Sequence, residues 1–419
     1  MIKYIPYLSF IVLLFSSCKP EEESLPQINA NFSASDLTIL EGKAVTFTDL
    51  STNNPSAWEW DFGSENINTS TDQNPTVIFE TSGVYDIKLV ASNESVSDTE
   101  IKSSFITVVE SLNAKFDLND SIINQGNQIQ FTDLSTGSSS NLEWTFEGGN
   151  PASSTESNPT VSYDSYGVYK VSLKVSSEFQ PEGRTATKTV VVLPTNGLIA
   201  YYPFSGNAED ESDNQFNGSI NGASATSDRY QQANQAFSFD GLNDYIETSN
   251  QIDENLSQGT SFSAWINISE VGSTVRIISN YNGTGIEGNC LERIGFVFGV
   301  SEDQELTIFY ATNGNDYDGR KTASGKIVAN QWYHVVGTWD GTFNPSGFKL
   351  YIDGVRNDQK DFEQGIVNCG GFQESENPFH IGIGHCSTGP CAPFNGAIDE
   401  VRIYNRVLNA QEILILTKN

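Results

Sequence analysis

Basic residues are scarce in this sequence of 419 residues. Lysine and arginine total 22 against 53 aspartates and glutamates, so the formal net charge is −31 at pH 7. A protein that binds nucleic acid must neutralise phosphates with lysine and arginine, and nucleic acid is therefore not an expected partner. At about 150 residues per domain, the length predicts two or three domains, each able to bury its own core.

Histidines and catalytic motifs are also few. The three histidines, His334, His380 and His385, form no H-E-x-x-H sequence, and no G-x-S-x-G nucleophile elbow is present. Metal-dependent hydrolysis and serine acyl transfer are therefore disfavoured. Residues 283–288 match G-x-G-x-x-G, but no helix or βαβ pattern follows them, which disfavours dinucleotide binding. The many carboxylates leave a glycoside hydrolase open as the enzymatic alternative.

No apolar run approaches the 18 or so residues of a membrane-spanning helix. The run over residues 5–15 follows Lys3 and has the length of the apolar part of a signal peptide. Two serines then precede Cys18, which resembles a bacterial lipobox, and residues 19–23 (KPEEE) resemble the export tag of Bacteroidetes surface lipoproteins.

The lipobox resemblance implies a signal peptide over 1–17, a diacylated Cys18 and an acidic tether over 18–26. It also implies that the protein is lipid-anchored in the outer membrane and faces the cell exterior. An ordinary secretory signal with an incidental cysteine is the alternative.

Cysteine is rare as well. Without Cys18 the chain has an even number of cysteines, as expected for an oxidising compartment, and two disulfides are predicted among Cys290, Cys369, Cys386 and Cys391. Three pairings exist; the turn-forming S-T-G-P sequence favours Cys386 with Cys391, and hence Cys290 with Cys369. A zinc site is the rival interpretation, but no pair has the C-x-x-C spacing.

The first half of the chain contains an internal repeat. Three short sequences recur at an offset of 84 residues: FTDLST at 47–52 and 131–136, NPTV at 74–77 and 158–161, and GVY at 83–85 and 167–169. The same offset carries Trp60 onto Trp144. Alternating polar and apolar residues between turn-rich clusters predict a small antiparallel sandwich over 27–110 and another over 111–194.

Both copies resemble the PKD domain, an immunoglobulin-like sandwich. The resemblance rests on WEWDFG at 58–63, NPTV, and SGVYDIKLVAS at 82–92. The second copy departs from this pattern, because Thr145 stands at the position equivalent to Asp61, although Trp144 is kept at the position equivalent to Trp60. Trp60 and Trp144 are expected to fill the cores. The resemblance implies that the two modules act as spacers.

From residue 195 the pattern changes, and one domain is expected over 195–419. Period-two alternation at 261–268, 348–353 and 379–384 predicts strands with one buried face. A helical pattern appears at the C-terminus, where Asn409 caps and Glu412 follows three residues later. A parallel α/β fold is therefore disfavoured.

Five blocks resemble, in family order, a laminin-G-like jelly roll of the concanavalin A-like class: 197–223, 236–247, 332–341, 350–354 and 394–413. The resemblance implies two stacked, curved antiparallel sheets, with a concave face and rim loops that bind glycans in many relatives. The fold class predicted for the chain is all-β: two immunoglobulin-like (PKD) sandwiches followed by a concanavalin A-like jelly-roll sandwich.

The family often holds a structural calcium ion, which takes oxygen ligands. The candidate ligands are Asp210, in an acidic loop, and Asp399, whose strand neighbours on the same face are apolar. A buried aspartate needs a partner. The alternative for Asp399 is a hydrogen bond to backbone or an ion pair with Arg402 or Arg406.

Glycan binding calls for an exposed ring that stacks on a sugar, flanked by carboxylates or amides. Tyr281 and Tyr317 lie in polar turns rather than alternating strands, and Asp316 and Asp318 flank the second tyrosine. These four are the predicted ligand-binding residues. Each tyrosine could instead anchor its loop, and Trp339 is expected in the core.

These observations predict a cell-surface lipoprotein that binds an extracellular polysaccharide or other glycan through its terminal jelly roll. An adhesive or structural protein that binds other proteins is the alternative. A glycoside hydrolase is disfavoured further, because the E-x-D-x-x-E strand motif of laminarinase-like relatives is absent.

Overall fold

The computed structural model describes residues 1, 27–63, 69–138, 141–282, 294–313, 316–358, 360–364, 372, 374–375, 377–386 and 389–419. The described chain forms two compact units; the first comprises residues 1–115, 135–141 and 174–184, and the second comprises the remainder. No helix in these ranges is long and apolar enough to cross a membrane. Cys18, Cys290 and Cys369, which carry sequence-based predictions, lie outside the described residues.

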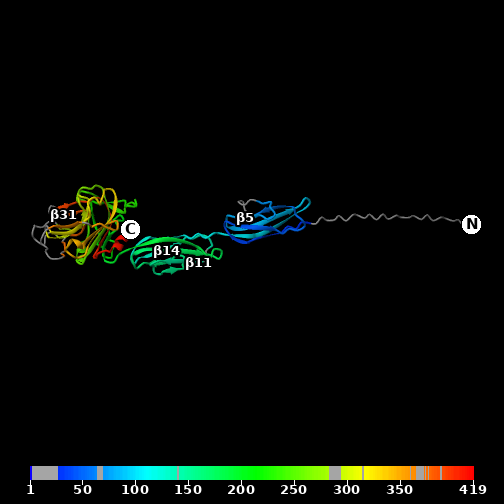
Figure 1. Ribbon diagram of the computed structural model, residues 1–419, viewed down its shortest axis with the longest axis horizontal. Coiled ribbons are helices and arrows are strands. Elements are labelled where there is room, and N and C mark those ends of the chain that lie inside the picture. Colours follow the sequence, from blue (N-terminus) through cyan, green and yellow to red (C-terminus); the bar gives the residue numbers. More distant parts are fainter. Residues whose placement is uncertain are drawn as a thin grey trace. The chain divides into compact units, whose positions relative to one another are not determined.

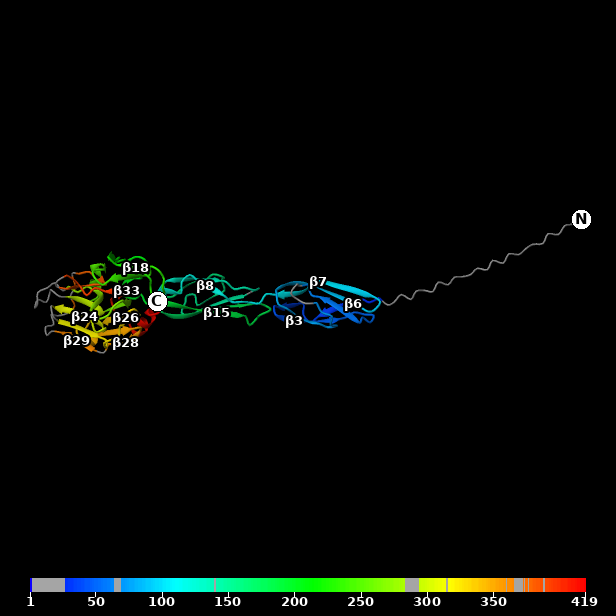
Figure 2. The same ribbon diagram turned by 90° about the horizontal axis from the view of Figure 1, so that it is seen from above.

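The first repeat copy folds into two sheets, several of whose strands are labelled in Figure 2. One sheet has the order β1 (Phe32–Ala34), β3 (Lys43–Asp49) and β5 (Thr76–Phe79). The other has the order β2 (Thr38–Leu40), β7 (Ser97–Val109), β6 (Gly83–Ser92) and β4 (Ala57–Asp61). The β2–β7 pair is parallel, whereas β6 pairs antiparallel with β4 and β7.

The core of the first copy follows from strand alternation. In β6, Tyr85, Ile87 and Leu89 are buried, because successive side chains of a strand point to opposite faces. Trp60 is fully buried, and its Nε1 donates a hydrogen bond of 2.9 Å to the carbonyl of Asp72. Its ring lies 5.3–6.2 Å from three phenylalanine rings, those of Phe32, Phe47 and Phe62. The predicted core role of Trp60 is confirmed.

The second copy repeats this arrangement (Figure 1). One sheet has the order β13 (Thr160–Ser162), β10 (Gln128–Asp133) and β8 (Phe116–Leu118). The other has the order β12 (Ser153–Ser154), β11 (Asn141–Phe146), β14 (Gly167–Ser176), β15 (Arg184–Leu193) and β9 (Ile122–Asn124). Its parallel pair, β9 with β15, corresponds to β2 with β7.

The aromatic core of the first copy recurs residue by residue in the second. Trp144 is fully buried, and its Nε1 donates a hydrogen bond of 2.8 Å to the carbonyl of Glu156, the equivalent of Asp72. The rings around Trp144 are the equivalents of those around Trp60: Phe116, Phe131 and Phe146. The loss of Asp61 in the second copy therefore leaves the aromatic core intact.

The C-terminal part contains two eight-stranded sheets. The first, called here the β21 sheet, has the order β18 (Ser224–Thr226), β19 (Ala236–Asp240), β33 (Asn395–Tyr404), β21 (Thr260–Ile268), β26 (Trp332–Trp339), β27 (Phe348–Ile352) and β28 (Val355–Arg356), with β16 (Leu198–Tyr202) paired to β33.

The second, called the β23 sheet, has the order β17 (Ser219–Asn221), β20 (Tyr245–Glu247), β30 (His380–Ile381), β22 (Val275–Ser279), β23 (Gly295–Val300), β24 (Leu306–Asn313), β25 (Asp316–Lys321) and β29 (Lys360–Gln364). A separate hairpin pairs β31 (Gly384–Cys386) with β32 (Gly389–Cys391). Two 3₁₀ helices, η1 (Asn250–Asn255) and η2 (Pro345–Gly347), and the short helix α1 (Ala410–Leu416) complete the described elements.

The two eight-stranded sheets share one apolar core. From the β21 sheet it takes the alternate residues of β21 that begin at Phe262, and from the β23 sheet it takes Phe296, Phe298 and Ile308. Trp339 is fully buried in this core, as predicted. Burial of this continuous apolar layer is what holds the sheets together.

The outer face of β21 is buried as well, which the sequence did not predict. Ser261 and Ser263 are both fully buried, and the Ser263 hydroxyl bonds the His334 ring at 2.9 Å. The prediction of only one buried face is therefore wrong for β21. The cause is tertiary: α1, which begins with the predicted capping box at Asn409, packs Ile413, Ile415 and Leu416 against the outer side of this sheet.

Trp60→Ala should destabilise the first copy by about 3–5 kcal/mol, because it removes a fully buried ring among three others. Hydrogen exchange of β3 and β6 in the full chain measures this. The control Ile101→Ala removes a side chain that is 58% exposed and should change stability by less than about 0.5 kcal/mol. Equal loss of protection in both variants would contradict the core assignment.

Candidate functional site

The outer face of the β23 sheet carries a row of side chains that differ in character along its length. Cross-strand register aligns Glu247, His380, Ser279, Val297 and Phe309 in this row. Each has a core residue next to it along its strand, so these five side chains point away from the core. The row is polar at one end and apolar at the other.

A second row contains both predicted tyrosines. Beyond β22, the N–H groups of Asn280 and Asn282 donate to the carbonyls of residues 296 and 294, which continues the pairing and places Tyr281 opposite Gly295. Gly295 pairs with Ala311, and Ala311 pairs with Tyr317. Tyr281 and Tyr317 therefore stand three strands apart at one end of one sheet, or about 14 Å at 4.7–4.9 Å per strand.

Tyr317 lies in a strand and not in a turn. Asp316, Tyr317 and Asp318 all belong to β25, which pairs with β24 on one side and β29 on the other. The turn prediction for Tyr317 is therefore wrong, because ladder hydrogen bonds on both sides outweigh the polar composition of the segment. Tyr281 does lie outside a strand, as predicted, and is partly buried.

Only glycine fits at position 295, between Tyr281 and Ala311 in this second row. Gly295 has φ +122°, and a Cβ there would approach the backbone and side-chain oxygens of Asn280 to 2.8 Å. The side-chain oxygen of Asn280 also accepts a hydrogen bond of 2.7 Å from the N–H of Phe296. The part of the sheet between the two tyrosine positions therefore consists of the small residues Gly295 and Ala311. The hydrogen bond between Asn280 and Phe296 fixes its backbone.

A histidine pair lies at the polar end of the first row, and sequence reasoning missed it. The Nε2 atoms of His380 and His385 are 3.3 Å apart, and Glu247 Oε2 lies 3.3 Å from His380 Nε2. Burial lowers the pKa of both imidazoles, and for His380 the neighbouring His385 lowers it further against the opposing effect of Glu247. The available signal was two histidines five residues apart beside Cys386.

The disulfide between Cys386 and Cys391 is confirmed. The two Cα atoms are 5.8 Å apart, and the bond links β31 to β32. His385 stands next to Cys386 on β31, so the bridged hairpin holds this imidazole against His380. The predicted pair of Cys290 with Cys369 lies outside the described residues.

A buried carboxyl supports the loop that follows β22. Asp253, in η1, is 1% exposed and accepts a hydrogen bond from the N–H of Ser375, whose hydroxyl donates 2.7 Å to the carbonyl of Asn280. Burial raises the pKa of Asp253 to about 7, against the lowering effect of the Ser375 N–H. Among the described residues, no arginine or lysine contributes to this pKa shift.

Asp210, predicted as a calcium ligand, is already surrounded by hydrogen-bond donors. Its Oδ1 accepts from the N–H groups of Tyr201 and Ser212 at 2.8 and 2.9 Å. Its Oδ2 accepts from the Ser212 hydroxyl and the Phe216 N–H at 2.8 and 2.7 Å. This geometry does not fit calcium, because four donors occupy the lone pairs that the ion would need.

Asp399 has an ion-pair partner that the sequence did not indicate. Its Oδ2 lies 2.8 Å from Nη1 of Arg229, which is 170 residues earlier and neither Arg402 nor Arg406. The guanidinium of Arg229 also lies 4.5 Å from the ring centre of Trp265. Throughout the described ranges, no three Asp, Glu, His or Cys side chains form a group that could hold a metal ion. Calcium at Asp210 or Asp399 stays a prediction that the geometry does not support.

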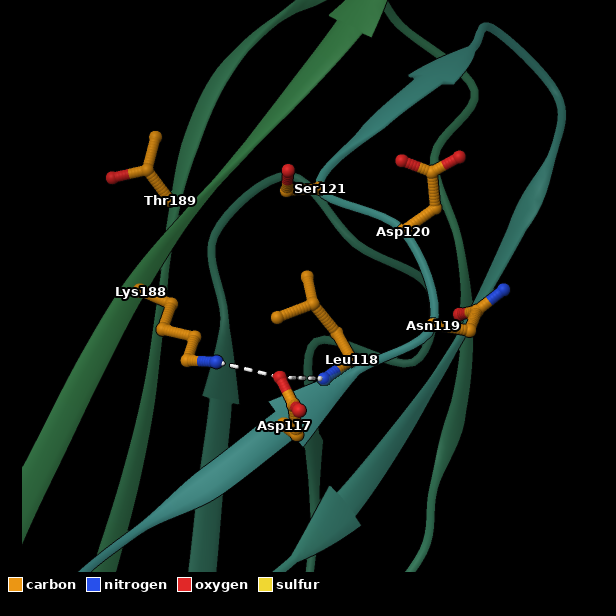
Figure 3. A pocket seen from close by; sticks show the side chains of 7 residues that line it. All are labelled: Asp117, Leu118, Asn119, Asp120, Ser121, Lys188 and Thr189. Carbon is orange, nitrogen blue, oxygen red and sulfur yellow. Dashed lines mark hydrogen bonds and ion pairs between the residues drawn. The ribbon is translucent and has the colours of Figure 1, made fainter. Parts of the chain in front are cut away.

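A pocket of about 510 Å³ lies in the second repeat copy (Figure 3). Its charged contact is between Lys188 Nζ and Asp117 Oδ1 at 2.7 Å, with side chains that are 40% and 63% exposed. The lining contains no aromatic ring; it consists of Asp117, Leu118, Asn119, Asp120, Ser121, Lys188 and Thr189. A polar hollow with a paired lysine and no ring offers no stacking surface to a sugar.

Family models match most of the chain. The model described as PKD domain matches residues 25–108 and 114–192, and the model described as concanavalin A-like lectin/glucanases superfamily matches residues 239–414. The chain therefore carries two PKD domains followed by a concanavalin A-like domain, which confirms the predicted all-β architecture. No curated protein matches the chain.

Similar solved structures include binding domains of botulinum neurotoxins. A type C structure, from work on cell entry dependent upon two ganglioside molecules, is 16% identical, with 54% of this chain and 51% of that chain covered and a TM-score of 0.37. A neurotoxin DC binding domain in complex with rat synaptotagmin II is 17% identical, with 54% and 52% covered and a TM-score of 0.38. The chain spans about half the length of these structures, and similarity at this level carries no inference about function.

Asp253→Asn should stabilise the protein progressively as pH rises. A carboxyl whose pKa is raised on folding contributes stability that is complete below its unfolded pKa of about 4 and is lost as pH rises through about 7. Asparagine keeps an oxygen for the Ser375 N–H without the charge. The free energy of unfolding of the variant minus that of the native chain should therefore be larger at about pH 8.5 than at about pH 5, by on the order of 1–3 kcal/mol. Thermal unfolding of both proteins at the two pH values measures this difference.

The control for this experiment is Glu254→Gln, which removes an exposed carboxylate from the same 3₁₀ helix. As a surface substitution, it should change the free energy of unfolding by less than about 0.5 kcal/mol at either pH. A difference for Asp253→Asn that stays constant from acid to alkaline pH would refute the assignment of a raised pKa.

Proposed function

We propose that this protein is a cell-surface lipoprotein that binds extracellular carbohydrate through the outer face of its β23 sheet. The observation that carries the proposal is the row in which Tyr281 and Tyr317 stand on either side of Gly295 and Ala311. Tyrosine has a flat apolar ring for the face of a sugar and a hydroxyl for its edge. Gly295 and Ala311, between these two positions, carry no large side chain.

The family of the terminal domain supports a carbohydrate ligand. The matching model describes a superfamily of concanavalin A-like lectins and glucanases, and lectins bind sugars without transforming them. The acidic net charge of −31 argues for a neutral ligand over an anionic one, since like charges repel. The superfamily also includes glucanases, but the E-x-D-x-x-E strand motif of laminarinase-like relatives is absent, and binding without catalysis is the proposed activity.

The PKD domains fit the role of spacers. Each has a self-contained aromatic core around Trp60 or Trp144, and the pocket at Lys188 holds a paired cation and no ring. The proposed lipid on Cys18 would attach the chain to the outer membrane, with the PKD domains between the anchor and the binding domain.

Tyr281→Ala and Tyr317→Ala should each weaken glycan binding about 2- to 12-fold, the equivalent of about 0.5–1.5 kcal/mol for a lost aromatic contact. A glycan array identifies the ligand of the full chain, and calorimetry then measures each variant. The control Tyr230→Ala removes a ring that is 57% exposed and lies over Arg229, whose partner Asp399 belongs to the β21 sheet; it should bind normally.

Absence of any glycan ligand for the full chain, or unchanged affinity in both variants, would overturn the proposed binding face. Trp60→Ala should leave glycan affinity unchanged even though it unfolds the first copy. Reduced affinity in that variant would show that the first PKD domain does more than act as a spacer.

Cys18→Ala should release the protein from the membrane fraction, because it removes the proposed site of acylation. Fractionation of cells followed by immunoblotting measures this. The control Cys386→Ala removes a cysteine that forms a disulfide, and it should stay attached. Membrane attachment of the Cys18 variant would show that the anchor lies elsewhere.

A further inference from the structure

Two imidazoles from different strands meet on the outer side of the β23 sheet, with ring centres 4.3 Å apart and ring planes tilted by 51°. His380, on β30, is 3% exposed and is held by pairing to β20 and β22 and by edge contact with the ring of Tyr245 at 5.2 Å. His385, on β31, is partly exposed and belongs to the hairpin closed by the Cys386–Cys391 disulfide. Both rings are therefore positioned by backbone pairing before any ligand arrives.

Two long contacts meet at Nε2 of His380. His380 Nε2 lies 3.3 Å from His385 Nε2 and also 3.3 Å from Glu247 Oε2. Both separations exceed the 2.7–3.2 Å of ordinary N–H hydrogen bonds. An imidazole nitrogen has either one proton or one lone pair, so His380 Nε2 cannot donate to Glu247 and accept from His385 at the same time.

A small cation between the two imidazoles is an alternative to these long hydrogen bonds. Zinc binds imidazole nitrogen at 2.0–2.1 Å, and in a tetrahedron of that size two ligand atoms are about 3.3–3.4 Å apart. The observed separation of the two Nε2 atoms is 3.3 Å. We propose that His380 and His385 together bind one zinc ion through their Nε2 atoms.

Water completes the coordination of this zinc ion. The Glu247 side chain is 46% exposed, and its Oε2 lies 3.3 Å from His380 Nε2. Among the described residues, no group of three such side chains could hold a metal ion, so Glu247 is not taken as a third ligand. Glu247 supplies a negative charge beside the ion.

The zinc site differs in kind and position from the tyrosine row. It uses nitrogen ligands from β30 and β31, whereas Tyr317 lies on β25 and Tyr281 follows β22. The zinc proposal therefore does not depend on glycan binding and can be tested without a sugar. A negative result in a glycan-binding assay would leave the zinc proposal standing, and a negative zinc titration would leave the glycan proposal standing.

Calorimetric titration of the full chain with zinc chloride, after removal of metals by chelation, tests the proposal. One zinc ion should bind, and His385→Ala should weaken that binding at least about tenfold. His385 is the deciding residue, because it is partly exposed and its variant should fold; circular dichroism in the absence of zinc checks this. Glu247→Gln should weaken binding only a few-fold.

The matched control is His334→Gln, which alters the third histidine of the chain, on β26 of the other sheet. It should bind zinc as the native chain does. Substitution with cobalt gives a second readout, since a tetrahedral site with nitrogen ligands absorbs visible light and the His385→Ala protein should not. Unchanged zinc affinity in His385→Ala, or no zinc bound by the native chain, would overturn the proposal and leave only a contact between two imidazoles.

Discussion

Burial of one apolar layer between two eight-stranded sheets is the constraint on which the terminal domain depends. Because strand side chains alternate between faces, placing Phe262, Phe296 and Ile308 in this layer decides which residues face outward. Register then decides which outward residues become neighbours. Tyr281 and Tyr317 share a row, and His380 lies beside Glu247, because pairing from β20 to β25 leaves no other register.

The outer faces of the two sheets differ in what covers them. Over the β21 sheet, apolar residues of α1 pack against Val336 and Tyr404, Arg229 pairs with Asp399, and the outer layer becomes part of the interior. Such a layer is stable only when its groups are paired, which explains the contacts of Ser263 with His334 and of Asp399 with Arg229. On the β23 sheet, the partly exposed Glu247 and His385 keep part of the outer face in contact with solvent.

Local sequence patterns predicted much of this architecture. The 84-residue repeat identified equivalent cores, and even the backbone partner of the tryptophan indole recurs at the same offset. Asn409 and Glu412 form the predicted capping box, and the short S-T-G-P sequence correctly indicated the Cys386–Cys391 disulfide. These features depend on residues that are close in sequence or on a regular period, so the chain itself displays them.

Sequence by itself determined the all-β class, the duplicated aromatic cores around Trp60 and Trp144, and the capped terminal helix, because each rests on periodicity or short-range contacts. Only the tertiary structure decided that Tyr317 lies within a strand, that Asp399 pairs with Arg229, and that His380 meets His385 and Glu247. These outcomes depend on strand pairing and on segments that close over a sheet. Composition cannot reveal them, because it holds no information on which distant strands become neighbours.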